Sequence, residues 1–243
     1  MTTSAVSVEK LLDLAIHQAN AGQRERAKSL CEQADAAHPA HPAVLQLLAV
    51  FSLQDGDFAR ARRHASASLA LRPDHVPTLV VAADAARAVD AFEEALTYYA
   101  RAHGLQSERV DIGLSLGALQ HRRGLLHPAL QTLEHVARLV PDQADVWFQL
   151  ALVRQDLRDL DGAALALRRV LQLAPERADA EVNLGIVLQE SGHVEQALCA
   201  YGRAYRLRED TFGRIAHALA AAGVGRLWLN LDELRDVLSI EPE

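Results

Sequence analysis

Residues 42–75 read PAVLQLLAVFSLQDGDFARARRHASASLALRPDH, and one alanine of this stretch, Ala61, recurs along the chain at intervals of 34 residues. Self-similarity at one fixed period is the signature of a repeat architecture, in which stacked copies of a small unit bury a shared core. The recurring alanines are Ala27, Ala61, Ala95, Ala129, Ala163 and Ala197. They predict six units of 34 residues, at 8–41, 42–75, 76–109, 110–143, 144–177 and 178–211.

Other places of the unit also hold the same residue type from unit to unit, and each of these residue types has a structural role. Ala49 holds the eighth place, which is always Ala or Gly, and Ala61 holds the twentieth. Small residues at both places allow two helices to cross closely. Gly56 holds the fifteenth place, where a glycine in four units supplies the left-handed conformation that ends a first helix, helix A. Pro73 holds the thirty-second place, where a proline in four units ends a second helix, helix B.

These columns resemble the tetratricopeptide repeat (TPR), a helix-turn-helix unit of this length, over residues 8–211. The resemblance implies an all-α fold, an α-solenoid in which antiparallel helix pairs stack into a right-handed superhelix. The composition agrees, because 50% of the residues are hydrophobic and only 13 are glycine and 8 proline, which favours helices over sandwiches and barrels.

Four residues depart from the pattern. Asp90 and Arg158 replace the turn glycine in the third and fifth units, so we expect irregular turns there. Gly113 and Glu181 stand at the fourth place, which is otherwise large and apolar, so we expect the start of helix A to pack less firmly in those units.

The two ends of the chain lie outside the six units. Residues 1–7 are expected to form a disordered tail, and residues 212–243 a degenerate seventh unit. Leu219 and Leu231 occupy columns that should be small, which disfavours a further stacked repeat. We interpret residues 227–238 as a terminal helix that caps the solenoid. The alternative is a dimerisation helix, because this segment has more leucines than one capping face needs.

The resemblance also implies a ligand groove, since TPR solenoids bind partners on a concave surface lined mainly by helix A. The fifth and ninth places of helix A, which should face solvent, are mostly apolar here, and an apolar stripe on a surface indicates binding. The alternative is that these residues only pack neighbouring A helices together. The candidate peptide-binding residues are Leu12, Ile16, Val50, Val80, Asp84, Arg87, Leu114, His121, Arg122, Phe148, Leu152, Val182, Asn183, Ile186 and Gln189.

Charged residues border the predicted groove. Arg87, His121 and Arg122 are expected to form one basic spot near the middle. An apolar floor with an acidic edge suits an amphipathic helix or extended segment that has leucine-type anchors and Arg or Lys flanks. The alternative for each single carboxylate is ordinary solubility. The acidic edge comprises Glu9, Asp13, Asp111, Asp145, Asp156, Asp179 and Glu190.

The sequence disfavours several other functions. A net charge of -7 argues against nucleic acid and anionic lipid as partners. The eleven histidines lack ligand spacing, and no nucleophile elbow or phosphate loop is present, so we expect no metal, no cofactor and no enzymatic activity. Cys31 and Cys199 suggest no disulfide framework; Cys31 is expected in the core, while Cys199 could be exposed.

The sequence also suggests where the protein works. The first residues do not form a signal peptide, and no apolar run approaches a membrane span, so a cytoplasmic location is expected. The bias toward Arg and Ala hints at a bacterial genome. We expect a non-catalytic scaffold or adaptor for a protein segment, with a role in the assembly or regulation of a larger complex. The alternative is a structural protein that self-assembles through its C-terminal helix or an end of the solenoid.

Overall fold

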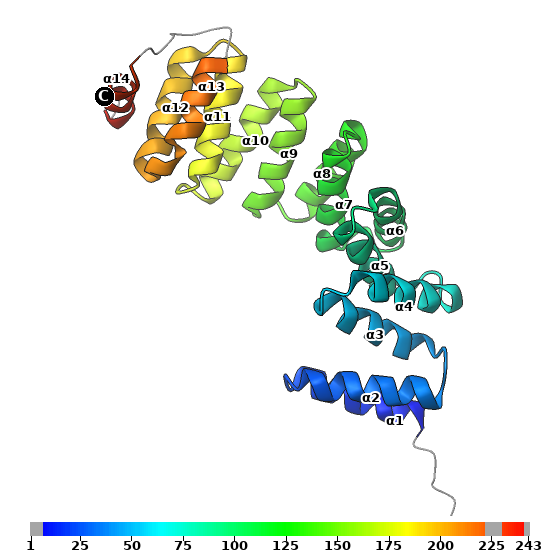
Figure 1. The fold of residues 1–243 in the computed structure, drawn as a ribbon. Helices are drawn as coiled ribbons and strands as arrows, with labels where there is room; N and C mark the ends of the chain where they lie inside the picture. Colours follow the sequence, from blue (N-terminus) through cyan, green and yellow to red (C-terminus); the bar gives the residue numbers. More distant parts are fainter. Residues whose placement is uncertain (1–6, 222–229, 241–243) are drawn as a thin grey trace, which may run out of the picture. The chain divides into compact units, whose positions relative to one another are not determined.

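The computed structural model describes residues 7–221 and 230–240, and every regular element within them is helical (Figure 1). This confirms the all-α expectation. Helix A starts at residues 8, 42, 76, 110, 144 and 178, each followed by a helix B. The helices are α1 (Val8–Asn20), α2 (Arg24–Ala37), α3 (Pro42–Gln54), α4 (Phe58–Leu71), α5 (Val76–Ala88), α6 (Phe92–Leu105), α7 (Val110–Arg122), α8 (Leu126–Leu139), α9 (Ala144–Asp156), α10 (Leu160–Leu173), α11 (Ala178–Glu190), α12 (Val194–Leu207), the short 3-10 helix η1 (Glu209–Thr211), α13 (Phe212–Ala221) and α14 (Leu231–Ser239).

The chain forms two compact bodies, residues 1–119 and 120–243. The core of each body follows the repeat columns, because the alanine of the twentieth place is at most 1% exposed in all six units. In the first body, Ala27 and Cys31 of α2 share a cluster with Leu48 of α3, so each pair is buried against the next. In the second body, Ala163 and Ala197 belong to one cluster that extends to the C-terminal helices.

The expectation of irregular turns at Asp90 and Arg158 is wrong. Both adopt the left-handed conformation of the turn glycines, with φ of 57° and 63°, compared with 76° at Gly56. One hydrogen bond is also shared: Ala91 N–H donates to the Ala86 carbonyl at 2.9 Å, as Asp57 N–H does to the Ser52 carbonyl in the turn of Gly56. The Asp90 turn differs in that Val89 N–H donates to the Ala86 carbonyl, three residues earlier, and not to the one four residues earlier. Packing of the flanking helices therefore imposes the turn, although this conformation costs a non-glycine residue about 1 kcal/mol.

The expectation of a loosely packed start of α11 is also wrong. The Glu181 side chain is only 7% exposed, and its two carboxylate oxygens accept hydrogen bonds from Arg203 Nε at 2.6 Å and Nη2 at 3.0 Å. A bidentate guanidinium satisfies a buried carboxylate, so an ion pair replaces the apolar contact that this place makes elsewhere. Gly113, the other departure at this place, is buried in α7.

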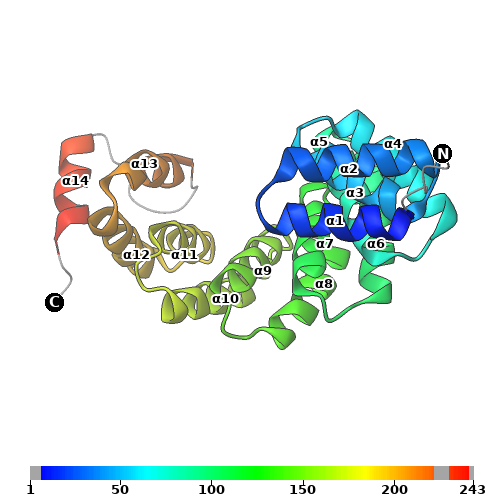
Figure 2. The ribbon, with the colours of Figure 1, turned by 90° about the horizontal axis from the view of Figure 1, so that it is seen from below.

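The C-terminal helix α14 packs against α12, beside which it lies in Figure 2. Leu234 and Leu238 of α14 are at most 1% exposed, whereas Leu231 is 52% exposed. Leu231 therefore does not cross another helix as its column predicts. Asn230 caps α14 by accepting a hydrogen bond from the Asp232 N–H at 2.9 Å.

Two sequence expectations at the chain ends fall partly outside the described residues. The start of the predicted terminal helix falls within residues 222–229, and the predicted N-terminal tail falls largely within residues 1–6. Ser7, which was assigned to that tail, is the N-cap of α1, because its hydroxyl accepts a hydrogen bond from the Lys10 N–H at 3.4 Å.

Three contacts hold α14 on α12 and η1–α13. Arg206 Nη1 donates to the carbonyls of Leu238 at 3.1 Å and Ile240 at 2.8 Å, which satisfies the C-terminal end of α14. The Arg235 guanidinium lies 4.4 Å from the centre of the Phe212 ring. The absence of a side chain at Gly202 allows α12 and α14 to approach closely, because a Cβ there would lie 3.2 Å from the Leu238 carbonyl oxygen.

Replacing Gly202 should therefore displace α14. We expect Gly202→Val to lower the free energy of unfolding of this end by about 1–3 kcal/mol through overpacking. Amide hydrogen exchange within α14 should accelerate. Gly104→Val is the matched control, because a Cβ at Gly104 meets nothing within 4 Å. Equal exchange rates in the two variants would contradict this account of the contact.

Replacing Asp90 should relieve the left-handed turn. We expect Asp90→Gly to raise the free energy of unfolding by about 0.5–1 kcal/mol, because glycine adopts this φ without steric cost. Urea unfolding measures the change. The reverse substitution in the equivalent turn, Gly56→Asp, should destabilise by a similar amount, and an Asp90→Gly variant no more stable than the wild type would show that the turn is unstrained.

Candidate functional site

The first body exposes an apolar strip on its A helices. Val50 of α3 and Val80 of α5 are both half-buried and pack against the same core cluster. Ile16 of α1, at the same place as Val50, is 46% exposed. Residues at the fifth and ninth places are four apart and share one face of a helix. In the first body this face also carries the polar residues Gln46 in α3 and Asp84 in α5. We call the surface that these places form the helix-A surface.

A polar group interrupts this strip at α5. The hydroxyl of Tyr99, which is 1% exposed, donates to Asp84 Oδ1 at 2.5 Å. Arg87 Nη2 lies 3.5 Å from the same oxygen. Burial is the main cause that raises the pKa of Tyr99 to about 12, and the Asp84 carboxylate adds to it. Asp84 and Arg87, both predicted site residues, are therefore held in place by a buried tyrosine of α6.

In the second body, Phe148 of α9 forms the centre of the helix-A surface. Its ring is half-buried, and the Arg177 guanidinium lies 4.4 Å from the ring centre. Arg177 also donates to Asp145 Oδ1 at 2.7 Å and to both oxygens of Asp179, the longer bond being 3.1 Å. The Arg177 hydrogen bond is the main cause that lowers the pKa of Asp179. These contacts fix the edge of the aromatic ring between two units.

Leu152 and Ile186 extend this apolar surface. Both are half-buried, and Ile186 of α11 packs with Phe148 against the core of the second body. Leu152 lies one helical turn after Phe148 on α9 and shares its face. Leu114 of α7, which corresponds to Phe148 but belongs to the first body, is also half-buried.

Four predicted site residues are buried in the fold and do not line an open surface. Leu12 is 8% exposed within the cluster of the first unit, and Val182 is fully buried. Asn183 Oδ1 accepts a hydrogen bond from Arg214 of α13 at 3.2 Å, and Gln189 Oε1 accepts one from the Tyr201 hydroxyl at 2.8 Å. Asn183 is bonded because α13 packs against α11, Gln189 is bonded because α12 does, and Leu12 is buried in the separate cluster that α1 forms with α2 and α3.

Most of the predicted acidic edge is paired within the protein. His121 Nε2, itself a predicted ligand contact, lies 2.7 Å from Asp156 Oδ2. Because arginines offset the charge of four of the seven carboxylates, the edge is less acidic than the sequence suggests. Arg87 belongs to the first body and Arg122 to the second, so the basic spot stays a prediction. The pairs are Asp111 with Arg109, Asp145 and Asp179 with Arg177, Asp156 with His121, and Glu190 with Arg158.

The sequence reasoning missed Tyr99 and Arg177. A signal for Arg177 is present, because an Arg-x-Asp sequence at the unit boundary occurs both at 109–111 and at 177–179. In both cases the arginine bonds the aspartate two residues later. Tyr99 offers a weaker signal, since its hydrogen bond depends on how two helices pack.

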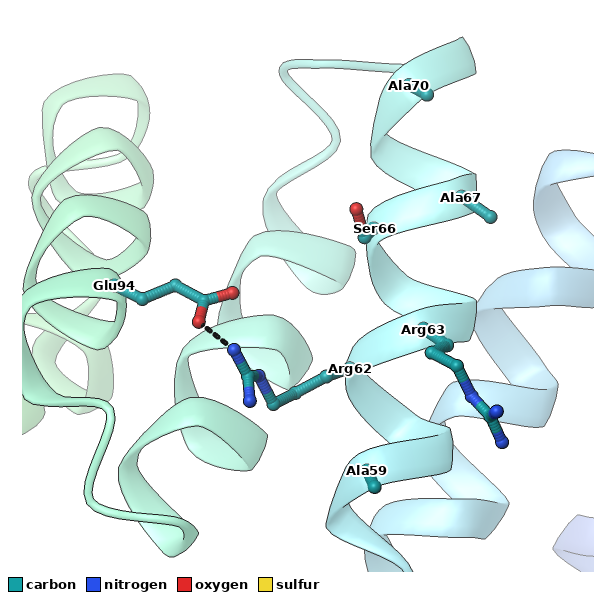
Figure 3. A pocket seen from close by; sticks show the side chains of 7 residues that line it. All are labelled: Ala59, Arg62, Arg63, Ser66, Ala67, Ala70 and Glu94. Carbon is teal, nitrogen blue, oxygen red and sulfur yellow. Dashed lines mark hydrogen bonds and ion pairs between the residues drawn. The ribbon is translucent and has the colours of Figure 1, made fainter.

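A hollow of about 750 Å³ lies on α4, a B helix, and not on the helix-A surface (Figure 3). Arg62 reaches across to Glu94 of α6 and forms an ion pair, while Arg63 points away from it. The other lining residues are small, so the hollow offers one ion pair and no constellation for catalysis. It is lined by Ala59, Arg62, Arg63, Ser66, Ala67, Ala70 and Glu94.

Within residues 7–221 and 230–240, no three His, Cys, Asp or Glu side chains lie close enough together to hold a metal ion. None of the helices described there is long and apolar enough to span a bilayer. Cys31 is fully buried, and burial raises the pKa of its thiol to about 11, whereas Cys199 is partly exposed.

Comparison with known families agrees with the repeat columns. Two models described as tetratricopeptide repeat match residues 18–80 and residues 144–177. The chain is a tetratricopeptide repeat protein. None of the curated proteins matches it. TPR proteins are in general scaffolds that bind other proteins, and this coarse function extends to the present chain.

Solved structures resemble this TPR protein in fold. The MamA protein is 18% identical, with a TM-score of 0.66 over 77% of this chain and 98% of that chain. YrrB, described as a TPR protein with an unusual peptide-binding site, is 19% identical, with a TM-score of 0.69 over 74% and 93%. PilF of Pseudomonas aeruginosa is 20% identical, with a TM-score of 0.64 over 83% and 92%. At these identities the likeness shows the fold alone.

The buried Tyr99 hydroxyl should make this TPR protein sensitive to alkali. The folded-state pKa of Tyr99 is about 12, and an unfolded tyrosine titrates near pH 10. Above pH 10 the unfolded chain releases this proton while the folded chain retains it, so the free energy of unfolding falls as pH rises through 12. We expect Tyr99→Phe to make the decrease in the free energy of unfolding between pH 10 and pH 12 smaller by about 2 kcal/mol.

Urea unfolding between pH 8 and pH 12 measures the effect. Tyr205→Phe is the control, because Tyr205 is half-buried and packs beside Phe212. A Tyr99→Phe variant whose stability falls as steeply as that of the wild type would contradict the assignment.

Proposed function

We propose that this TPR protein is a non-catalytic scaffold or adaptor that binds an apolar or amphipathic segment of another protein on its helix-A surface. The observation that carries the proposal is the row of half-buried apolar side chains at solvent-facing places, above all Phe148, Leu152 and Ile186 in the second body. Water-exposed apolar area of this kind is stabilised when a ligand covers it.

These side chains are suited to binding because the fold already orients them. Arg177 stacks on the Phe148 ring and is itself bonded to two carboxylates, so the ring does not need to be ordered when a ligand arrives. Pre-organisation of this kind lowers the entropy cost of association. Ile186 is likewise fixed by its packing against the core.

The pairing of the acidic edge refines the expected ligand. Leucine-type or aromatic anchors should supply most of the affinity, and Arg or Lys flanks should contribute mainly to orientation and association rate. The description of YrrB as a TPR protein with a peptide-binding site supports the choice of a peptide segment. We also propose that binding takes place in the bacterial cytoplasm and assists the assembly or regulation of a larger complex.

The test uses a phage library of random 16-residue peptides selected on the full chain. A selected peptide, labelled with a fluorophore, should lose affinity about tenfold or more with Leu152→Asp, because a buried leucine contributes about 1.5–3 kcal/mol. Leu165→Asp is the matched control, because Leu165 is a 63% exposed leucine on helix B. Circular dichroism confirms that both variants fold. Peptides that bind both variants equally well would place the binding surface elsewhere.

Self-association is a second candidate function, and one observation favours it. Leu14 of α1 is 45% exposed, although its place in the repeat is a core place in every other unit. An exposed apolar side chain at the end of a stack is a contact that another protein surface can complete.

A further inference from the structure

The first helix of the stack exposes a place that the other units bury. Leu14 holds the seventh place of its unit and is 45% exposed. Its counterparts in the next five units are Leu48, Ala82, Leu116, Leu150 and Leu184, and these are between 1% and 4% exposed. Leu11, at the fourth place, is only half-buried, whereas Leu45 and Leu79 at that place are buried.

The cause of this difference is the covering helix. Leu48 of α3 is buried in one cluster with Ala27, Cys31 and Ala34, which all belong to α2. Helix B of one unit thus covers the seventh place of the following unit. Within the described residues no helix precedes α1, and Leu14 is 45% exposed.

A charged residue of the same unit, Arg26, indicates which charge a surface that packs over Leu14 should have. In the second and third units the nineteenth place forms an ion pair with the preceding helix B: Arg60 lies 3.6 Å from Glu32, and Glu94 pairs with Arg62. The last three units have Pro128, Gly162 and Gln196 there. Arg26 holds this place in the first unit, and its Nη1 donates to Gln23 Oε1 at 2.7 Å. A surface that covers Leu14 is therefore expected to present a carboxylate to Arg26. We call Leu11, Leu14 and Arg26 the end face.

The other end of the chain has a cavity that fits such an apolar side chain. It lies between α12 and α14 and has a volume of about 210 Å³. A cavity of roughly 150 Å³ holds benzene, so this one has room for a leucine side chain. Arg206 also borders it, but its guanidinium is bonded to two carbonyls of α14. The lining residues are Leu198, Cys199, Gly202, Arg206, Val237 and Ile240.

Carboxylates accompany this cavity. Glu233 and Val237 are four residues apart and share one side of α14, with Asp236 next to Val237, and Ile240 follows the last helical residue in extended backbone. Val237 is 37% and Ile240 67% exposed, so the apolar edge of the cavity is open to solvent. Arg235 lies elsewhere on the helix, over Phe212. This side of α14 combines apolar and acidic groups, as the end face requires.

We propose that the end face of one copy docks on the α12–α14 cavity of a second copy. Leu14 enters the cavity, and Arg26 faces the carboxylate of Asp236. The inference rests on the self-association candidate and is independent of ligand binding on the helix-A surface. Because the two surfaces differ, the contact is heterologous, and each copy that docks leaves one end face and one cavity free for further copies.

A disulfide across the proposed contact tests it directly. Cys199 lines the cavity, and the other native cysteine, Cys31, is fully buried, with a pKa raised to about 11, so it is unreactive at neutral pH. Full-length Leu14→Cys is treated with diamide, which takes up two electrons and two protons as two thiols form one disulfide. We expect intermolecular links between residues 14 and 199, seen as a ladder of species on a non-reducing gel and assigned by peptide mass spectrometry.

Asp13→Cys is the matched control, because Asp13 is an exposed neighbour turned about 100° away on α1. It should link to Cys199 at least fivefold less. Links mainly between two copies of residue 14 would indicate a symmetric contact and overturn the proposal, as would equal yields from the two variants.

Sedimentation of the wild type and of Leu14→Glu separates this inference from the function on which it rests. We expect concentration-dependent association in the wild type and its loss in Leu14→Glu. A wild type that remains monomeric at all concentrations would remove the self-association candidate altogether. If Leu14→Glu still associates and Leu14→Cys forms no link to Cys199, self-association stands and this contact is overturned.

Discussion

The close crossing of two helices at a small residue is the constraint on which the rest of this structure depends. The alanine at the twentieth place of each unit is almost completely buried, and a larger side chain there would separate helix A from helix B. Because the helices approach closely, the side chains around the crossing pack into a continuous core. That core in turn leaves Val50, Phe148, Leu152 and Ile186 half-buried at the surface of the A helices, although Leu12 and Val182 at the same places are buried.

The sequence predicts this framework well, since it depends on a period and on residue size. Local contacts are harder to predict. Asp90 and Arg158 suggested irregular turns, yet the helices on either side impose the left-handed conformation on them. Glu181 suggested loose packing because a lone carboxylate is costly to bury, but the guanidinium of Arg203 comes from another helix, 22 residues away in sequence.

The candidate surface shows the same limit. Periodicity identified Phe148 and Ile186, since residues four apart share a helix face. It could not show that Asn183 and Gln189 are bonded to Arg214 and Tyr201, because those bonds depend on how α13 and α12 pack against α11. Nor could it show that arginines pair with most of the acidic edge. A column of residues indicates which side of a helix faces out; tertiary contacts decide which groups remain free.

The division into two compact bodies has a consequence for affinity. Each body has half-buried apolar residues on its A helices, so under the proposed function a partner with two anchor clusters would engage them one after the other. Once the first cluster is bound, the second binds at an effective concentration set by the spacer between the clusters. Two individually weak contacts then give tight binding when the spacer matches the span, and loose binding when it is too short. Selectivity among partners would then reside in spacer length as much as in the anchors themselves.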